Sequence, residues 1–250
     1  MAKSGRPSRA SGGASGRGAR RPAASAKGAK GTRPAPKKKP AQKVVFDAPA
    51  PPPEEPRSFR LGAVPGATPG KWIDIWKRRM PHVELELIPV SAADQRSALE
   101  ELDAVLVRLP LVDDTLHIIP LYDELPVVVA SAESHLLSAD ELTYADLEGE
   151  VLITPLDDVL GPLEIPGTTA PRFAPLATTG DAIATVATGV GIIVTPMSLA
   201  RAHRRKDVDY RLLEGGPTSS VALAWPRDRT TDDVDAFIGI VRGRTANSSR

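Results

Sequence analysis

The sequence predicts an α/β fold, in which a mainly parallel sheet is covered by helices and preceded by a disordered arm. Two observations carry this prediction. From Ser58 onward, strand-like and helix-like stretches follow one another in the order β-α-β-α-β, which is typical of parallel sheets. Residues 1–43, by contrast, contain no Ile, Leu, Val, Phe, Trp or Tyr, so they have too little apolar area to offset the entropy of folding.

Charge divides the 250-residue chain in the same way. Its 32 Lys and Arg and 31 Asp and Glu give a net charge of +1. Residues 1–43 hold 13 of the basic residues and no acidic one, which leaves residues 44–250 with a net charge of −12. We expect residues 1–57 to form a disordered basic arm, rich in Lys, Arg, Pro and Ala, and a Pro-rich linker.

The composition of the arm predicts electrostatic contacts. Gly5-Arg6-Pro7 resembles the core of an AT-hook, an extended segment that lies in the DNA minor groove, although a second arginine beside glycine is missing. Clustered cations can also neutralise phosphates and release counterions. The candidate nucleic-acid-binding residues are Arg6, Arg20, Arg21, Lys37, Lys38 and Lys39. A solvated tail, a tail that folds back on the acidic body, and contact with another acidic partner stay open as alternatives.

Several classes of protein are excluded by composition and motifs. The chain has no cysteine, which rules out disulfides and Cys-ligated metal sites. No apolar run approaches about 18 residues, and the basic N-terminus lacks the apolar stretch of a secretory signal, so we expect a cytoplasmic protein. The histidines are scattered, the folded part has no Gly-x-Ser-x-Gly, and residues 66–71 depart from a P-loop. We therefore expect no catalytic residue, no metal, no cofactor and no enzyme.

The first half of the folded part alternates between strands and helices. Thr68 and Pro69 predict the N-cap and first position of a helix, because threonine can accept a free amide proton and proline has none to donate. Ser91 or Asp94 is the candidate cap of a second helix. The expected order is a strand at 59–64, a helix at 68–80, a strand at 83–88, a helix at 91–102 and a strand at 103–108.

The second half continues with shorter elements. Ser138, followed three residues later by Glu141, has the pattern of a capping box for a short helix. Thr179 or Asp181 is the candidate cap of a further helix, and Thr231 begins the last one. The expected order is strands at 116–121 and 125–130, a helix at 138–147, a strand at 151–153, a helix ending at 187, a strand at 191–194, a helix at 196–202, strands at 210–213 and 221–225, and a final helix from 231.

Several of these segments match one protein family in their order and spacing. They are residues 59–64 with the following helix, 81–87, 103–110, 119–122, 179–196 and 221–226, together with the last helix. In this respect residues 58–245 resemble the effector-binding domain of LysR-type transcriptional regulators. That family carries a winged helix-turn-helix before this domain, whereas residues 1–57 lack the apolar periodicity that a recognition helix needs. We therefore expect no DNA reading by a helix in the major groove.

The resemblance implies a two-lobed, periplasmic-binding-protein-like fold of type 2. Lobe I would comprise residues 58–130 plus 219–245, lobe II would comprise residues 131–218, and a small ligand would lie in the cleft. The reading from the residues agrees, because strand ends and helix N-termini form the binding edge of a parallel α/β lobe. Two facing edges of this kind make a clamp.

Seven residues at these edges are the candidate ligand-binding residues. Thr68 suits a carboxylate or another anion, because free amides and the helix dipole meet at a helix N-terminus. Arg108 ends a predicted strand and either faces an anionic ligand or forms a surface salt bridge. For Thr68 and for the other candidates except Arg108, a plain helix cap or turn residue is the alternative. The full set is Thr68, Ser91, Arg108, Thr154, Thr179, Gly180 and Thr195.

Together, these features predict a regulatory domain that senses a small organic acid or amino-acid-like molecule. We expect it to act in transcriptional regulation, with non-specific DNA contact by the arm. The expected partners are a small anionic effector, nucleic acid, and a second copy of the chain or a partner regulator, and no membrane. The alternative is a protein–protein module that pairs with intact LysR-type regulators without binding DNA itself.

Overall fold

The computed structural model describes residues 57–243 of the chain. The prediction of a basic arm lies outside the described residues, because it falls on residues 1–56.

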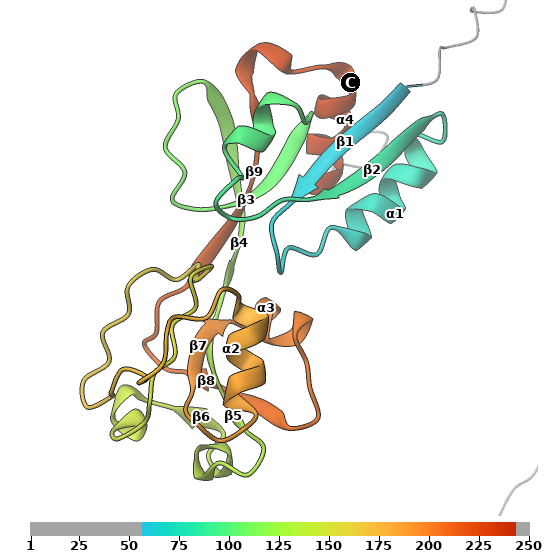
Figure 1. Ribbon diagram of the computed structural model, residues 1–250. Helices are drawn as coiled ribbons and strands as arrows, with labels where there is room; N and C mark the ends of the chain where they lie inside the picture. The colour runs from blue at the N-terminus through green and yellow to red at the C-terminus, as the bar shows by residue number, and fades with distance from the viewer. Residues whose placement is uncertain (1–56, 244–250) are drawn as a thin grey trace, which may run out of the picture. The chain divides into compact units, whose positions relative to one another are not determined.

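The first subdomain (residues 57–124 and 219–243) contains a five-stranded sheet in the order β2-β1-β3-β9-β4 (Figure 1). β1 pairs in parallel with β2 and β3, whereas β9 runs antiparallel to β3 and β4. The carboxyl ends of β1 to β4 and the start of β9 therefore lie at the same edge of the sheet. The strands are β1 (Arg57–Ala63), β2 (Val83–Pro89), β3 (Ala104–Arg108), β4 (Leu116–Glu124) and β9 (Ser219–Pro226).

Both faces of this sheet are covered. On one face, α1 (Gly70–Arg79) and α4 (Asp232–Val241) pack on β1 through a cluster that contains Phe59, Trp76 and Phe237. Alternate residues of β3 point into a second cluster on the other face. All five residues of β3 are buried, which explains the unbroken apolar run in its sequence.

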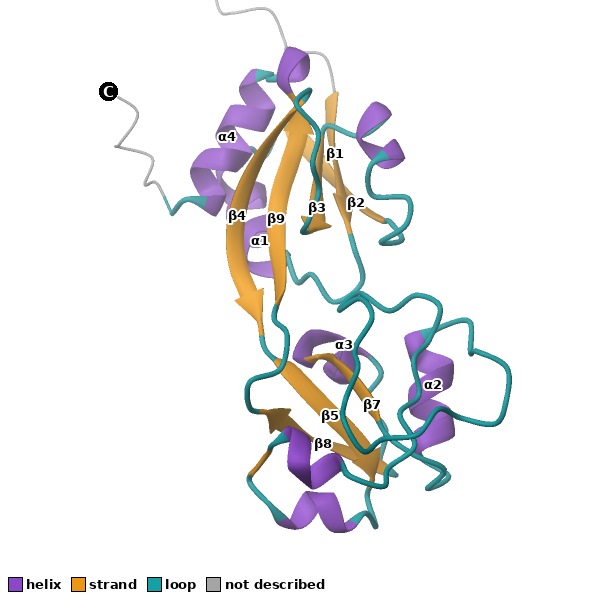
Figure 2. Ribbon diagram, turned by 90° about the vertical axis from the view of Figure 1, so that its left-hand side faces the viewer, coloured by secondary structure: helices purple, strands orange, loops and turns teal. Residues whose placement is uncertain are grey.

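The second subdomain (residues 125–218) contains a four-stranded sheet in the order β6-β8-β5-β7 (Figure 2). β5 pairs antiparallel with β7 and β8, and β6 pairs in parallel with β8. Two helices cover one face of β5, and short 3-10 helices cover the other. The elements are β5 (Pro126–Ser131), β6 (Glu141–Leu142), α2 (Thr179–Val186), β7 (Ile193–Pro196), α3 (Met197–Ala202) and β8 (Val208–Leu213).

The chain crosses between the two subdomains twice. One crossing lies at Leu125, between β4 and β5, and the other runs from β8 to β9. Glu124 and Ser219 are partners in the pairing of β4 with β9, so the two crossings leave the first sheet side by side. The α/β fold with two lobes is confirmed. The lobe boundaries stay a prediction, although β5 belongs to the second sheet whereas residues 126–130 were expected in lobe I.

The prediction of a mainly parallel sheet is wrong. The first sheet has two parallel and two antiparallel pairings, and in the second sheet only β6 and β8 are parallel. A parallel pair needs a crossover that returns the chain to the same end of the sheet. β9 instead begins where the chain returns from the second subdomain, beside the carboxyl ends of β3 and β4. It is therefore antiparallel to both strands.

The predicted helix at 91–102 is also wrong. This segment forms turns followed by a 3-10 helix at Ser97–Glu100. The Ser91 hydroxyl accepts a hydrogen bond from the amide of Asp94 at 3.0 Å, and it donates to the Asp94 carboxylate at 2.6 Å. Side-chain bonds of this kind close a local turn in competition with the helical pattern.

The segment at 138–147 forms no continuous helix. It holds the end of one 3-10 helix, the short strand β6 and a second 3-10 helix at Tyr144–Leu147. A capping box does occur here, but it pairs Thr143 with Asp146 rather than Ser138 with Glu141. The sequence carries two successive cap patterns, and the one nearer the buried Leu147 forms the capping box.

Helix starts differ from the prediction in two places. α1 begins at Gly70 after Pro69, with no side-chain cap, so Thr68 lies just outside the helix. The cap of α2 is Thr178, whose hydroxyl accepts from the amide of Asp181 at 3.1 Å, and not Thr179 or Asp181. The predicted strand at 151–153 makes only two isolated bridges.

Candidate functional site

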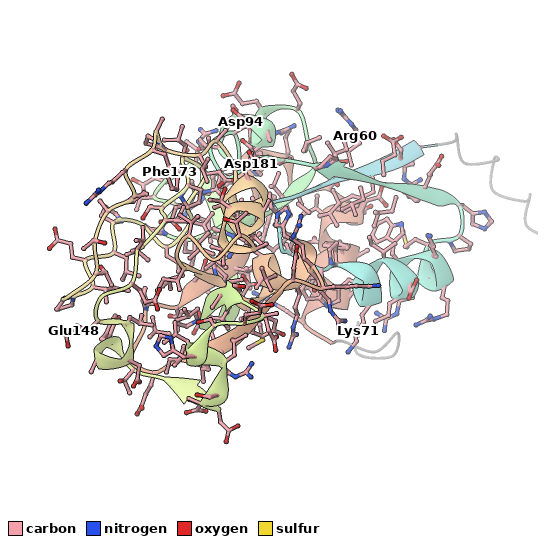
Figure 3. All side chains as sticks on the ribbon, turned by 60° about the horizontal axis from the view of Figure 1, so that its bottom comes forward. Arg60, Lys71, Asp94, Glu148, Phe173 and Asp181 are labelled. Atoms are coloured by element: carbon pink, nitrogen blue, oxygen red, sulfur yellow. The ribbon has the colours of Figure 1, made fainter. Side chains whose placement is uncertain are left out.

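The candidate site begins at the carboxyl edge of the first sheet. Thr68 and Ser91 follow β1 and β2, and both are exposed. The first turn of α1 holds no acidic residue and no side-chain cap, and Lys71 is exposed in that turn (Figure 3). Uncapped amides, the helix dipole and a lysine make this end of α1 favourable to an anion.

The edge is joined by a tyrosine that the sequence analysis missed. Tyr122 on β4 has its hydroxyl in a backbone hydrogen bond with Thr68. Burial, and then the charge of Glu124, raise the pKa of Tyr122 above its ordinary value of 10.0, while Thr68 and Arg108 partly offset this rise. The hydroxyl therefore stays protonated and able to donate at neutral pH. No motif marks Tyr122, because it is one residue in an irregular strand.

Arg108, at the end of β3, lies at the centre of a buried polar group that we call the junction network. Its Nη1 donates to Glu124 Oε2 and to Ser219 Oγ, both at 2.7 Å. Its Nη2 donates to the carbonyl oxygen of Pro65 at 2.9 Å. Ser198 of α3 donates to Glu124 Oε2 at 2.8 Å. The network therefore connects the first subdomain with the first turn of α3 in the second.

The ion pair within this network is buried and not on the surface, contrary to one of the two expectations for Arg108. Arg108 and Glu124 are only 4% and 8% exposed. In this buried environment, the attraction between the two charges, 2.7 Å apart, offsets the free-energy cost of removing them from water. Loss of either residue leaves the other charge buried without a counter-charge. Nε of Arg108 is the buried side-chain nitrogen in residues 57–243 that has no hydrogen-bond partner.

Two further residues, Gln95 and Gly66, shape the surroundings of Arg108. The Gln95 amide bonds both backbone groups of Arg108: its oxygen accepts at 2.8 Å, and its nitrogen donates at 3.1 Å. Gly66 has a φ of +86°, and a Cβ at this position would lie 2.3 Å from Ser198 Oγ and 2.8 Å from Arg108 Nη2. Glycine is therefore required where the turn after β1 meets α3.

In the second subdomain, the predicted residues lie around the starts of α2 and α3. Thr179 is buried and donates to Asp157 at 2.9 Å, which fixes a loop residue to α2. A Cβ on Gly180 would lie 3.0 Å from the His203 ring. Thr195 is buried in β7, opposite Val127, two residues before α3 begins. These three residues therefore have structural contacts of their own.

Thr154 differs from them because it is exposed and lines a small cavity. Asp158 lines the same cavity, and burial raises the pKa of its carboxyl above the ordinary range, with the charge of Asp157 adding to the shift. The main cavities of the described part are each lined by one subdomain alone. Of the seven predicted residues, only Thr154 lines one of them. The structure thus brings Thr68 and Arg108 together around Tyr122, and it leaves Ser91 in its own turn.

Sequence reasoning missed Glu124, Ser198, Ser219 and Tyr122, which surround Arg108. The only signal for Glu124 was an acidic residue between two apolar strand segments. Residues 57–243 contain no group of three His, Cys, Asp or Glu placed to hold a metal ion. None of their helices is long and apolar enough to cross a bilayer.

Comparison with known proteins gives one family and a consistent fold. The family described as LysR substrate binding domain matches residues 54–246. The Hca operon transcriptional activator HcaR of Escherichia coli is 25% identical over 210 residues, which cover 78% of this chain and 70% of HcaR.

Solved structures agree with that match. The reduced OxyR regulatory domain of Pseudomonas aeruginosa has a TM-score of 0.58 at 20% identity, covering 75% of this chain and 96% of that one. The BenM effector binding domain with its effector benzoate has a TM-score of 0.61 at 18% identity, covering 75% and 91%. These likenesses confirm the two-lobed, periplasmic-binding-protein-like fold of type 2.

Proposed function

The chain belongs to the LysR substrate binding domain family, and from this premise we propose that it binds a small organic anion where its two subdomains meet. The family consists of ligand-sensing domains of transcriptional regulators, and this chain shares their regulatory role. The single observation that carries the proposed site is the junction network, in which the carboxyl edge of the first sheet meets the start of α3. Ligands of open α/β sheets bind at such strand ends.

The proposed ligand is a carboxylate or an amino-acid-like molecule. Benzoate, an aromatic carboxylate, is the effector of the structural relative BenM. Here the uncapped start of α1, Lys71 and the Tyr122 hydroxyl are groups that favour an anion over a cation. We propose Thr68 and Thr154 as direct contacts, because both are exposed. The full proposed set is Thr68, Ser91, Arg108, Thr154, Thr179, Gly180 and Thr195.

Thermal denaturation of the full chain with a panel of small carboxylates, including benzoate, tests the proposed site. A ligand at about 100 times its Kd should stabilise the fold by about 2.7 kcal/mol. Thr68→Val should weaken the affinity for the carboxylate about ten- to a hundredfold, because one hydrogen bond to a charged group is lost. Thr169→Val, at an exposed threonine with no recorded side-chain bond, is the matched control. The site is refuted if the Thr68 and Thr169 variants bind alike.

We propose a second contact, with nucleic acid, through the basic arm. The support is the separation of charge, since residues 1–43 hold 13 cations and no anion. The contact residues are proposed to be Arg6, Arg20, Arg21, Lys37, Lys38 and Lys39. Filter binding at increasing salt should show a steep loss of DNA affinity in the full chain and little binding after removal of residues 1–43. Equal binding by the two forms excludes the arm.

We also propose that the domain pairs with a second copy or with an intact LysR-type regulator, in the cytoplasm and without enzymatic turnover. The support is that β2 is an edge strand of the first sheet within residues 57–243 and that Leu87 on it is 48% exposed. Light scattering should give the mass of a dimer, and Leu87→Lys should lower it. Co-purification with a regulator in the absence of DNA would favour the protein–protein alternative.

A further inference from the structure

We propose that Ser198 is a positioning residue of the ligand site, which acts through Glu124 and Arg108 to hold the two subdomains in register. This inference rests on the proposed function, since it concerns how that site is kept in order. Ser198 contacts no predicted ligand residue except Arg108, at 3.5 Å from Nη2. Its stronger bond is the one to Glu124 Oε2, at 2.8 Å.

The position of this bond in the fold supports the proposal. Glu124 and Ser219 form the last recorded rung of the β4–β9 pair, from which both crossings leave the first subdomain. Arg108 Nη1 binds both of them, so the guanidinium fixes the two crossings to the end of β3. Ser198 is the member of the network that belongs to the second subdomain. A movement that separates the start of α3 from the end of β4 therefore lengthens the Ser198–Glu124 distance.

The surroundings of Arg108 show that the network is kept at a cost. The guanidinium is almost completely buried, and its Nε has no partner among the described groups. An unpaired buried donor is rare in folded proteins, because leaving its hydrogen-bonding capacity unused costs free energy. A Cβ at Gly66 would lie 2.3 Å from Ser198 Oγ and 3.2 Å from Leu199 Cδ2, so the turn after β1 packs closely against the start of α3.

Loss of the Ser198 hydroxyl should allow the two subdomains to move more freely against each other, while Arg108 and Glu124 keep each other as counter-charges. In Ser198→Ala, Glu124 keeps its bond to Arg108, so the fold should be retained. The aligned arrangement becomes less populated, and the apparent affinity for a ligand falls by the same fraction. We expect about a three- to tenfold weaker affinity, which corresponds to the loss of one hydrogen bond of ordinary net strength.

The test uses the lack of cysteine in the chain. Spin labels on Glu86→Cys and Asp140→Cys, at exposed positions of the first and second subdomains, report the distance between them in the full-length protein. Labelled chains are diluted with unlabelled chains, so that labels on the two different chains of a dimer do not contribute to the measured distances. Ser198→Ala should broaden the distance distribution or add a second peak. Ser220→Ala is the matched control, because it removes a serine–carboxylate bond to Asp123 on the neighbouring rung, within one subdomain.

The distance measurement needs no ligand, so it separates this inference from the proposed function. An unchanged distribution in Ser198→Ala, or an equal broadening in Ser220→Ala, overturns the positioning role. Benzoate affinity is then measured on the same variants if benzoate stabilises the parent. A weaker affinity in Ser198→Ala alone supports the role, and equal affinities in both variants overturn it. Failure of every carboxylate to bind refutes the proposed ligand and leaves the distance result standing.

Discussion

Individual side chains of this protein act mainly through charge and burial at the edge of the first sheet. Arg108 could be identified from the sequence as a polar residue at a strand end, but not as the partner of Glu124, because the two are brought together by the pairing of β3 and β4 with β9. Its burial is also a tertiary property, since α3 arrives from the second subdomain. The sequence therefore predicted the residue and not its role.

Glu124→Ala should destabilise the protein by about 3–5 kcal/mol, because it leaves the buried guanidinium of Arg108 without a counter-charge. The double variant Arg108→Met with Glu124→Leu should recover most of this loss, since no charge is then buried. Urea denaturation of the two variants and the parent measures both values. A loss below about 1 kcal/mol in Glu124→Ala would mean that the pair is solvated, as expected for a surface salt bridge.

Tyr122 should make stability fall at alkaline pH. Its pKa is raised in the fold by burial and by Glu124, so the protonated hydroxyl is the form that the fold favours. The resulting stabilisation is fully present below the ordinary tyrosine pKa of about 10, and it is lost as the pH rises through the higher pKa of the folded state. Urea denaturation at neutral and alkaline pH should show a smaller alkaline loss in Tyr122→Phe than in the parent. Identical losses would show that Tyr122 ionises normally in the fold.

Elements of secondary structure form where sequence signals and packing agree. Thr231 was predicted to begin the last helix, and its hydroxyl does accept from the Val234 amide, while Val234, Phe237 and Ile238 fill the core below. The stretch at 91–102 had similar capping residues. There, however, the side chain of Ser91 closes a turn with Asp94, and the side chain of Gln95 bonds the backbone of Arg108. These bonds favour turns over a continuous helix. Such long-range partners cannot be found from local spacing.

Thr231→Ala should cost about 1 kcal/mol, because the N-cap bond of α4 is lost beside three acidic residues that favour the same helix end. Thr169→Ala is the control and should stay within about 0.5 kcal/mol of the parent, as is usual for an exposed side chain without a partner. Chemical denaturation compares the two. Equal values would show that α4 is held by its apolar face alone.

At the scale of the whole described chain, the two subdomains have separate cores. The rings of Trp76, Phe59 and Phe237 pack together in the first, with centroids 4.8–5.9 Å apart, whereas Val127, Val129 and Ile183 belong to the second. All three tryptophans, at positions 72, 76 and 225, belong to the first subdomain. Tryptophan fluorescence is therefore a built-in reporter of that half, whereas circular dichroism reports both.

Ile183→Ala should separate these two signals. Removal of the buried side chain costs about 2–5 kcal/mol in the second core, so the circular dichroism transition should begin at lower denaturant than the fluorescence transition. Phe237→Ala, in the first core, should instead shift the fluorescence transition. Coincident transitions in both variants would show that the subdomains unfold as one cooperative unit.

The pairing of Glu124 with Ser219 has a consequence for the architecture as a whole. Residues 125–218 form an insertion between two neighbouring strand ends, and a short hairpin loop could join those ends directly. The five strands and two helices of the first subdomain would keep every pairing partner after such an excision. The second subdomain is thus a module added to a complete framework, and the hydrogen bond from Ser198 to Glu124 ties it to that framework at its base.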